Sequence, residues 1–451
     1  MSASSLEDKI QQTGNIARML RNAQVGHYPF PFRSEFTNWR DEQEAWVSTA
    51  VLFDQSFHMT DFYFKGPDVM RLLSDVGVNS FAAFGKNKAK QFLACNYDGY
   101  VISDAILFGL DDNEVSLVGN PAVSHWVAFH AETGGYDVQV TRDERAAQNN
   151  GRRIVFRYQI QGPNALKIVE KAHGGPIEHI KFFNIGEFTI AGRPVRALNH
   201  TMTGAPGLEM TGLEMFGPAD DGPAVLDALL EAGAEFGLHQ GGSLAYSTTA
   251  LESGWIGLPV PAIYTGARMK PYRKWLGADS LEASSSIGGS FASDDIEDYY
   301  VTPWDLGYGR VVKFDHDFIG RAALEKLAGQ PHRRKVWLRW NNDDVSRVFA
   351  SSLFDRDHRA KYLSVPHGIY ATWQWDKVLM GDRVVGMSGK TGYTVNIGSW
   401  ASLAIIDEAD ARDGAEVTLV WGEEDGGSAK PSVERHVQTN IRATVSTHPL
   451  V

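Results

Sequence analysis

A pattern of strand, Gly-Pro turn and helix occurs twice in this chain, and it limits the fold more than any other feature. In the first copy, an alternating strand ends at Phe64, and a Gly-Pro turn at 66–68 opens a helix that reaches Val76. The second copy runs through 157–161 into a Gly-Pro turn at 162–164. Two such units in one chain predict an internally duplicated α+β arrangement.

The length and charge of the chain limit its organisation and its partners. At 451 residues the chain exceeds one ordinary hydrophobic core, so we expect two or three domains. The formal net charge of −12 argues against nucleic acid or an anionic membrane as a partner. If a small-molecule ligand is itself anionic, basic side chains have to gather around its site. The oligomeric state stays open, and a homo-oligomer is compatible with the sequence.

The single cysteine, Cys95, excludes an internal disulfide and a cysteine-ligated metal cluster, which is typical of a reducing compartment. Glu7 and Asp8 stand where a signal peptide would be basic, and no run approaches the roughly 20 apolar residues that span a bilayer. The close spacing of the acids and histidine at 315–317 indicates a solvated turn. We therefore expect a cytoplasmic protein without a bound metal.

The N-terminal segment predicts a helix followed by an aromatic arm. Ser5 and Asp8 stand in a capping-box relation, and the apolar spacing that follows favours one amphipathic helix over residues 5–24. Residues 26–32 are rich in proline and aromatic side chains and cannot be helical. Tyr28 and Phe30 in this arm either pack on the core or wall a pocket for an aromatic ligand.

A tight turn brings a carboxylate to the mouth of a strand. Gly204, Pro206 and Gly207 predict a sharp bend after His200, and the strand that follows begins around Glu209. A carboxylate fixed there can accept two parallel hydrogen bonds from an amidine-like edge, such as that of a pterin. The same pattern also fits an ordinary hairpin with a solvated acid.

Further polar residues lie beside predicted strands. His58 is at a strand end, where a lone histidine is usually structural. The stretch from Asn96 to Asp104 precedes a strand at 105–110. Gln161 lies beside the Gly-Pro turn of the second repeated unit, where its amide can hydrogen-bond a ligand.

Taken together and in this order, these motifs resemble those of the glycine-cleavage T-protein (aminomethyltransferase) superfamily. The matching segments are the His-Met pair at 58–59, the stretch at 96–104, the Thr-Gly turn that leads to Glu209, and the Leu-Glu-x-Gly run at 251–254. The resemblance covers nearly the whole chain. It implies a T-protein-like α+β fold that binds folate, with duplicated α+β subdomains and a C-terminal β-barrel-like domain.

The motifs also suggest domain boundaries. We expect an N-terminal helix and aromatic arm over 1–45, a folate- and substrate-binding core over 46–330, and the barrel-like domain over 331–451. Within the core, a segment at about 259–293 is rich in glycine, serine, proline and aromatic residues. It resembles an insertion of O-demethylases, which the shorter aminomethyltransferases lack, and could cover the substrate side.

Within the superfamily, the chain most resembles the tetrahydrofolate-dependent O-demethylases of lignin-derived methoxy-aromatics, the vanillate/3-O-methylgallate and syringate enzymes. Tyr246 and Trp255 are features of that branch. The resemblance implies a methyltransferase of aromatic catabolism that moves a methyl group from an aryl ether oxygen to N5 of tetrahydrofolate. The products would be 5-methyltetrahydrofolate and a phenol, and no metal is implied.

Such a reaction needs a general acid beside the leaving oxygen to relieve its negative charge. We expect Tyr246 to be that group, because the pKa of a phenol lies near that of the departing phenol. His58 would orient Tyr246 or hold a neighbouring ring hydroxyl, while Tyr28 and Phe30 would contact the substrate. Without the resemblance, Tyr246 would better fit a hydrogen-bonded tyrosine of the core.

The resemblance also assigns residues to the folate. Glu209 and Gln161 would bind the pterin edge, and Trp255 would pack on its face. Asp104, as a third catalytic residue, and Asn120, on the substrate side, would line the meeting point of the two ligands.

Two positions depart from the family pattern. Ser103 replaces the first of two paired acids, which weakens a proton-transfer role for Asp104. Neutral Asn120 stands where the O-demethylases carry an arginine suited to a substrate carboxylate. The identity of the methoxy-aromatic therefore stays open. Three basic residues of the insertion are alternatives for binding a carboxylate: Arg268, Lys270 and Arg273.

Other functions are compatible with parts of the sequence. A demethylase of sulfonium or quaternary ammonium compounds would need no general acid, because its leaving group departs neutral. Aminomethyl transfer fits less well with the lost acid and the long insertion. A non-catalytic folate-binding protein of the iron–sulfur-assembly type would carry a Lys-Gly-Cys signature, whereas Cys95 follows Leu93 and Ala94.

Overall fold

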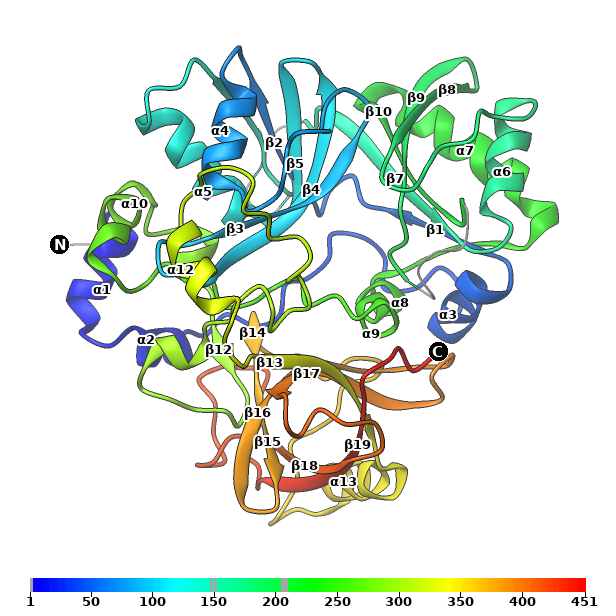
Figure 1. Cartoon of the computed structure of the whole chain (residues 1–451). Helices are drawn as coiled ribbons and strands as arrows, with labels where there is room; N and C mark the ends of the chain where they lie inside the picture. The colour runs from blue at the N-terminus through cyan, green and yellow to red at the C-terminus, as the bar shows by residue number, and fades with distance from the viewer. Residues whose placement is uncertain (1–2, 147–148, 150–151, 204–209) are drawn as a thin grey trace.

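The computed structural model describes residues 3–146, 149, 152–203 and 210–451, which form two α+β lobes above a β-barrel (Figure 1). One lobe contains a five-stranded sheet, the other a six-stranded sheet, and the C-terminal region closes into a barrel of six strands. The predicted α+β class with a C-terminal barrel is confirmed.

The sheet of the first lobe has the order β3-β4-β5-β2-β6, and all its neighbouring strands are antiparallel. Its strands are β2 (Thr60–Lys65), β3 (Ala89–Cys95), β4 (Val101–Asp111), β5 (Glu114–Gly119) and β6 (Gln139–Asp143). Helices α4 (Val69–Val76) and α5 (Pro121–Thr133) share one hydrophobic core with these strands.

The sheet of the second lobe has the order β11-β1-β7-β10-β9-β8. Its strands are β1 (Ala50–Asp54), β7 (Val155–Gln161), β8 (Ile185–Ile190), β9 (Arg193–Asn199), β10 (Gly212–Pro218) and β11 (Leu238–Gln240). Helices α6 (Ala165–His173) and α7 (Gly222–Gly233) pack against it. Strand β1 precedes the whole first lobe in the chain, yet it pairs with β7 and β11 of the second. The chain therefore crosses between the lobes directly after β1.

Both predicted strand, Gly-Pro and helix units form, as β2 with α4 and as β7 with α6. The glycine in each turn has a left-handed backbone, with φ of 155° at Gly66 and 132° at Gly162. A Cβ at Gly66 would lie 2.1 Å from the carbonyl oxygen of Asp137, and one at Gly162 would lie 2.6 Å from that of Thr49. Close backbone approach thus requires glycine at the same point of both units.

The barrel has the closed order β13-β17-β16-β15-β18-β19. Its strands are β13 (Arg333–Trp340), β15 (Asp376–Met380), β16 (Arg383–Thr394), β17 (Ser399–Asp407), β18 (Glu416–Trp421) and β19 (Thr439–Ser446). Helix α13 (Asn342–Phe354) contributes Val345 and Val348 to the barrel core. Closure leaves no free sheet edge.

The N-terminal segment differs from its prediction. The capping box of Ser5 and Asp8 is present. The single helix predicted over residues 5–24 is wrong, because Gly14 ends α1 (Leu6–Thr13) with φ of 70° and Asn15 then caps α2 (Ile16–Asn22). A third helix, α3 (Trp39–Ser48), follows the aromatic arm.

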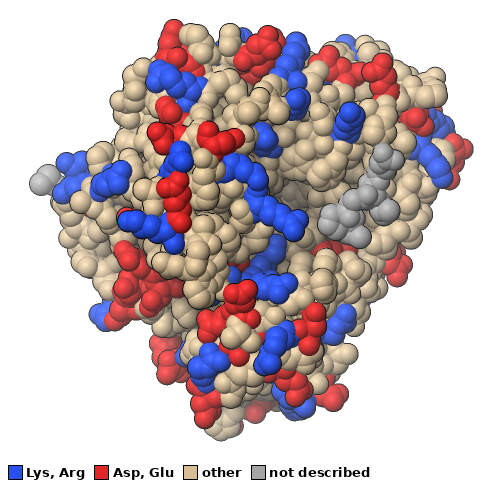
Figure 2. Space-filling model, in the orientation of Figure 1, with Lys and Arg blue, Asp and Glu red and all other residues tan. Residues whose placement is uncertain are grey.

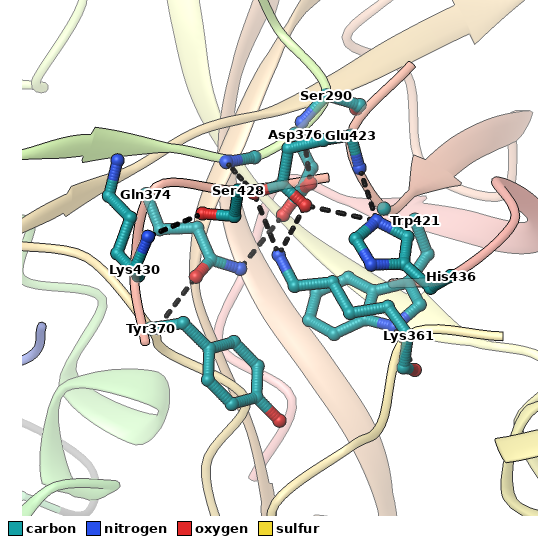
Figure 3. Close-up of polar contacts among 12 residues, drawn as sticks. Ser290, Lys361, Tyr370, Gln374, Asp376, Trp421, Glu423, Ser428, Lys430 and His436 are labelled. Carbon is teal, nitrogen blue, oxygen red and sulfur yellow. Dashed lines mark hydrogen bonds and ion pairs between the residues drawn. The ribbon is translucent and has the colours of Figure 1, made fainter. Parts of the chain in front are cut away.

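The segment at 259–293 connects the N-terminal helices to the barrel. It contains α10 (Lys270–Trp275), α11 (Leu281–Ser284) and β12 (Ile287–Gly288), and β12 pairs with β14 (Trp373–Gln374). Figure 3 shows its barrel end, where the Ser290 N–H donates to Asp376 Oδ1 at 3.0 Å. Nearby, Lys361 Nζ lies 3.0 Å from Glu423 Oε2.

Short helices complete the fold. These are α8 (Ser243–Tyr246), α9 (Thr249–Ser253) and α12 (Arg321–Leu327), with single 3₁₀ turns at Ala219–Asp221, Ala234–Phe236, Ala267–Met269 and Ile296–Tyr299. Within the described ranges, none of the helices has the length and apolar character to cross a bilayer.

Charge is unevenly distributed on the surface. On the face drawn in Figure 2, Lys and Arg side chains gather along one border of the hollow near the centre, although the net charge of the chain is −12. An anionic ligand that approaches this hollow therefore meets a locally positive field.

Candidate active site

A hydrogen bond joins Tyr246 and His58. The Tyr246 hydroxyl lies 2.7 Å from Nε2 of His58, and the side-chain amide of Gln55 donates to the same hydroxyl at 3.1 Å. Tyr246 ends α8, while Gln55 and His58 lie in the loop after β1. Gln55 was not among the predicted site residues, although it lies only three residues before His58.

Glycine allows α8 to start close to the aromatic arm. A Cβ at Gly242 would lie 2.2 Å from the carbonyl oxygen of Ser34, so a larger residue would push the helix away. The Gly242 N–H also donates to Oε2 of buried Glu42 at 2.8 Å. The Gly-Gly pair before α8 thus fixes the position of Tyr246 against the arm.

Aromatic rings surround the Tyr246–His58 pair. The ring centroids of Phe30, Phe32 and Phe53 lie 5.1 to 5.7 Å from that of Tyr246. Phe30 also lies 5.2 Å from the imidazole of His58. The predicted arm therefore contributes directly to the surroundings of this pair.

The pair is neutral at physiological pH. Burial lowers the pKa of His58 to about 3, and the positive charge of Arg145 acts in the same direction. Burial raises the pKa of the Tyr246 phenol above its ordinary value. The site therefore offers a protonated phenol beside an uncharged imidazole.

Gln161 is connected to Gln55 of this site by hydrogen bonds to Met202. Its Oε1 accepts a hydrogen bond from the Met202 N–H at 3.2 Å. The sulfur of Met202 in turn accepts from the Gln55 amide at 2.8 Å. These contacts connect the end of β7 to Tyr246.

Asp104 and Trp255 form a second cluster. Oδ2 of Asp104 accepts hydrogen bonds from the Trp255 indole N–H at 2.9 Å and the Tyr308 hydroxyl at 2.8 Å, and the amide of Gln91 also donates to it. Burial raises the pKa of Asp104, and these donors partly oppose that shift. Trp255 is 40% exposed. Tyr308 was missed because its contact with Asp104 joins segments far apart in the chain, and Gln91 because its contact depends on the pairing of β3 with β4.

Asn120 lies at the start of α5. Its Oδ1 accepts from the Ala122 N–H at 2.9 Å, so its side chain caps the helix.

The three basic residues of the insertion that were considered for a substrate carboxylate contact Glu7 or Tyr97. Arg273 donates to Glu7 Oε2 at 2.7 Å, and the guanidinium of Arg268 lies 3.9 Å from the ring centroid of Tyr97. Lys270 also lies beside Glu7, at 3.7 Å.

Glu209 and the glycines of its turn lie outside the described residues. His200 precedes that segment and Glu214 follows it, and Nε2 of His200 lies 2.6 Å from Oε2 of Glu214. The other carboxylate oxygen of Glu214, Oε1, lies 2.5 Å from the Arg157 guanidinium. Burial opposes the charge of Glu214, but its partners Arg157 and His200 prevail and lower its pKa to about 2. Arg157 also pairs with Asp61 of the first lobe at 3.0 Å. This ionic cluster fixes the two lobes to each other.

Several buried polar side-chain atoms among the described residues have no hydrogen-bond partner, and three of them are amide or carboxyl oxygens. They are Oε1 of Gln55, Oε1 of Gln159 and Oδ1 of Asp104. Since buried acceptors in folded proteins are normally paired, these oxygens are suited to meet donors of a bound molecule.

The chain is similar to proteins of known activity. The family model for the GCVT N-terminal domain matches residues 11–258. A syringate O-demethylase from Sphingobium sp. is 46% identical over 449 residues, 99% of this chain and 96% of that protein. A sesamin methylene transferase from Sinomonas sp. is 29% identical over 446 residues, 95% of this chain and 91% of that protein. An aminomethyltransferase of Streptomyces avermitilis is 28% identical over 379 residues, 83% of either protein.

One solved structure has a related fold over the full length. It is the crystal structure of the glycine cleavage system aminomethyltransferase T from Bartonella henselae, with a TM-score of 0.61 and 17% sequence identity. The match covers 99% of this chain and 97% of that one. The two proteins therefore share their fold.

Proposed function

This chain belongs to the family defined by the GCVT N-terminal domain, and we propose that it is a tetrahydrofolate-dependent O-demethylase of a methoxylated aromatic compound. The 46% identity to a syringate O-demethylase along nearly all of both proteins supports this activity. The observation that carries the proposal is the hydrogen-bonded Tyr246–His58 pair beside the ring of Phe30. An aromatic substrate can pack on such rings while its ether oxygen meets the phenol hydroxyl.

The proposed reaction transfers one methyl group. The bond between the methyl carbon and the aryl ether oxygen breaks, and a bond forms between that carbon and N5 of tetrahydrofolate. N5 gives up its proton and the leaving oxygen gains one, so the products are 5-methyltetrahydrofolate and a phenol. Negative charge develops on the departing oxygen, and a positioned proton donor there is worth about 10²- to 10⁴-fold in rate.

Tyr246 is the donor in this proposal. The phenol is protonated and can hydrogen-bond the leaving oxygen, but burial raises its pKa, so the match with the pKa of the departing phenol that the sequence suggested is not kept. The Gln55 amide donates to the Tyr246 oxygen and stabilises charge that develops there. Neutral His58 holds the hydroxyl and can accept its proton only at an energetic cost, which favours donation toward the substrate.

We propose that residues beside the Tyr246–His58 pair and in the separate Asp104–Trp255 cluster together bind the pterin. Bound tetrahydrofolate supplies N5 as the methyl acceptor, and a pterin presents several N–H donors along one edge. The unpaired acceptors Gln55 Oε1, Gln159 Oε1 and Asp104 Oδ1 match that need. We propose that Gln161 and Glu209 bind the pterin edge and that Trp255, fixed by Asp104, contacts the pterin face. Basic side chains beside the central hollow suit the negative charge of the folate tail (Figure 2).

We also propose that the enzyme works in the cytoplasm. Its single cysteine supports this, because Cys95 is a buried free thiol.

Anaerobic incubation with tetrahydrofolate and a panel of methyl donors tests the proposal. The panel contains vanillate, syringate, 3-O-methylgallate, guaiacol and a sulfonium compound, and mass spectrometry follows 5-methyltetrahydrofolate. We expect methyl transfer from at least one aryl ether. Transfer from the sulfonium compound alone would replace the O-demethylase proposal with a sulfonium demethylase.

A further inference from the structure

A polar cavity of about 320 Å³ lies where the N-terminal helices, the insertion and the barrel meet. The end of α2 contributes Arg21, and β12 contributes Ile287. The loop at 423–435, which joins β18 to β19, contributes Lys430 and Arg435. None of these residues belongs to the Tyr246–His58 pair or to the Asp104–Trp255 cluster, so this is a second site with room for a small ligand.

The loop that lines the cavity has a fixed shape. The Gly426 N–H donates to the carbonyl oxygen of Glu423 at 3.0 Å, and the His436 N–H donates to the carbonyl oxygen of Gly426 at 2.9 Å. Gly426 has φ of 65°, and a Cβ there would lie 2.2 Å from the carbonyl oxygen of His436. Glycine is therefore required at this turn, which holds the two halves of the loop together beside the cavity.

Lys430 is a buried cation whose hydrogen-bond partners are neutral. Its side chain is 2% exposed, and Nζ donates to the carbonyl oxygens of Arg21 at 2.6 Å and Ile287 at 2.5 Å. An ammonium has three N–H donors, so one remains for a ligand. Burial and the charge of Arg21 lower the pKa of Lys430 to about 8. Its charged form therefore gains from an anion in the cavity.

The two arginines of the cavity also donate to neutral acceptors. Arg21 donates to the carbonyl oxygens of Phe291 and Gly289, each at 3.1 Å. Arg435 donates to the carbonyl oxygen of Asp425 at 3.0 Å. These contacts orient both guanidinium groups without neutralising them.

The acids of the cavity do not balance these three cations. Glu423 is paired with Lys361, whose Nζ lies 3.0 Å from Oε2, and it also accepts from the Gly289 N–H at 3.1 Å (Figure 3). Asp425 is exposed and contributes one negative charge. The three positive charges of Arg21, Lys430 and Arg435 thus face one free carboxylate, which leaves an excess of two in a chain whose net charge is −12.

We propose that this cavity binds the phosphate group of a small phosphorylated compound. A phosphate monoester carries about −1.5 to −2 charges at pH 7 and three acceptor oxygens, which match the excess charge and the donors of Lys430, Arg21 and Arg435. A carboxylate has one negative charge and matches less well. The bound phosphate would connect α2 to the barrel loop. This site does not depend on the proposed O-demethylase activity.

Calorimetric titration of the full-length protein tests the proposal, with inorganic phosphate, glycerol 3-phosphate and acetate compared at constant ionic strength. We expect saturable binding of at least one of the two phosphates, with a rise in Tm that follows its concentration. Acetate at the same concentrations should produce neither effect. Tighter binding of glycerol 3-phosphate would identify a phosphorylated metabolite as the ligand, and tighter binding of inorganic phosphate would identify the free ion.

Three variants connect the binding to this cavity. Arg435→Gln removes an exposed guanidinium, and we expect phosphate affinity to fall about 10- to 100-fold, the usual range for a charge-assisted hydrogen bond. Lys430→Gln should weaken binding at least as much, and Arg435→Gln alone decides if that variant does not fold. Arg383→Gln is the matched control, because it removes another exposed arginine of the barrel, one that pairs with Asp407 and Asp410. It should leave phosphate affinity unchanged.

Three results would each overturn the proposal. The first is a wild-type protein that binds neither phosphate, and the second is acetate binding as tight as that of phosphate. The third is phosphate affinity that Arg435→Gln leaves unchanged or that Arg383→Gln lowers equally, because the anion would then lie elsewhere on the surface.

Discussion

The hydroxyl of Tyr246 lies 2.7 Å from Nε2 of His58, and neither group is charged at physiological pH. Burial holds both in their neutral forms, since it lowers the pKa of His58 to about 3 and raises the pKa of the phenol. A site of this kind suits a neutral ether whose oxygen becomes charged only as its bond to carbon breaks, because the donor is already in place.

The pH dependence of activity should reveal the neutral histidine. An ordinary histidine titrates near pH 6.5, whereas His58 with a pKa of about 3 stays unprotonated from pH 5 to pH 8. We expect kcat/KM for guaiacol to show no inflection from His58 in that window. An inflection near pH 6.5 that disappears in His58→Gln would mean that the imidazole is charged during catalysis.

Glu214 should contribute to stability in a pH-dependent way. Its folded-state pKa is lowered from 4.5 to about 2, so its contribution is present above pH 4.5 and is lost as the pH falls through about 2. A shift of this size corresponds to about 3 kcal/mol. We expect Glu214→Gln to lower the free energy of unfolding in urea by about that amount at pH 7, and by less at pH 3.

Glu187→Gln is the matched control, because Glu187 is an exposed acid that also pairs with an arginine, Arg196, at 3.5 Å. Exposed pairs contribute at most about 1 kcal/mol, so little change is expected. A Glu214→Gln effect that is the same at pH 7 and pH 3 would show that lost packing, not the ion pair with Arg157, is responsible.

Asn120 should stabilise the folded protein as the N-cap of α5. Removing an N-cap side chain typically costs about 1 kcal/mol, so Asn120→Ala should lower the free energy of unfolding by that amount. Asn120→Asp retains an acceptor for the Ala122 N–H, so its free energy of unfolding should stay within a few tenths of a kcal/mol of the wild-type value. Equal stability of Asn120→Ala and the wild type would show that the cap contributes nothing.

Local features of the fold could be predicted from sequence. The two Gly-Pro turns, the capping box at Ser5 and the β-rich C-terminal region depend on short patterns, and all three are present. The N-terminal helix was predicted too long, because the apolar spacing continues past Gly14 while the backbone turns left-handed there. The pairing of β1 with β7 and β11 could not be predicted, since it joins strands far apart in the chain.

The candidate site was predicted only in part. Tyr246, His58 and Phe30 were named from motifs, and the structure brings them together. Trp255 was predicted as a stacking residue, and the additional contact of its N–H with Asp104 has no sequence signal.

The dependence of rate on the leaving group tests the central claim, that Tyr246 protonates the departing oxygen. A series of substituted methoxy-aromatics with leaving phenols of decreasing pKa is compared in the wild type and in Tyr246→Phe, with tetrahydrofolate binding measured as a control. We expect Tyr246→Phe to lose about 10²- to 10⁴-fold in kcat with poor leaving groups, and much less as the leaving phenol becomes more acidic. A uniform loss across the whole series, or none, would contradict the account.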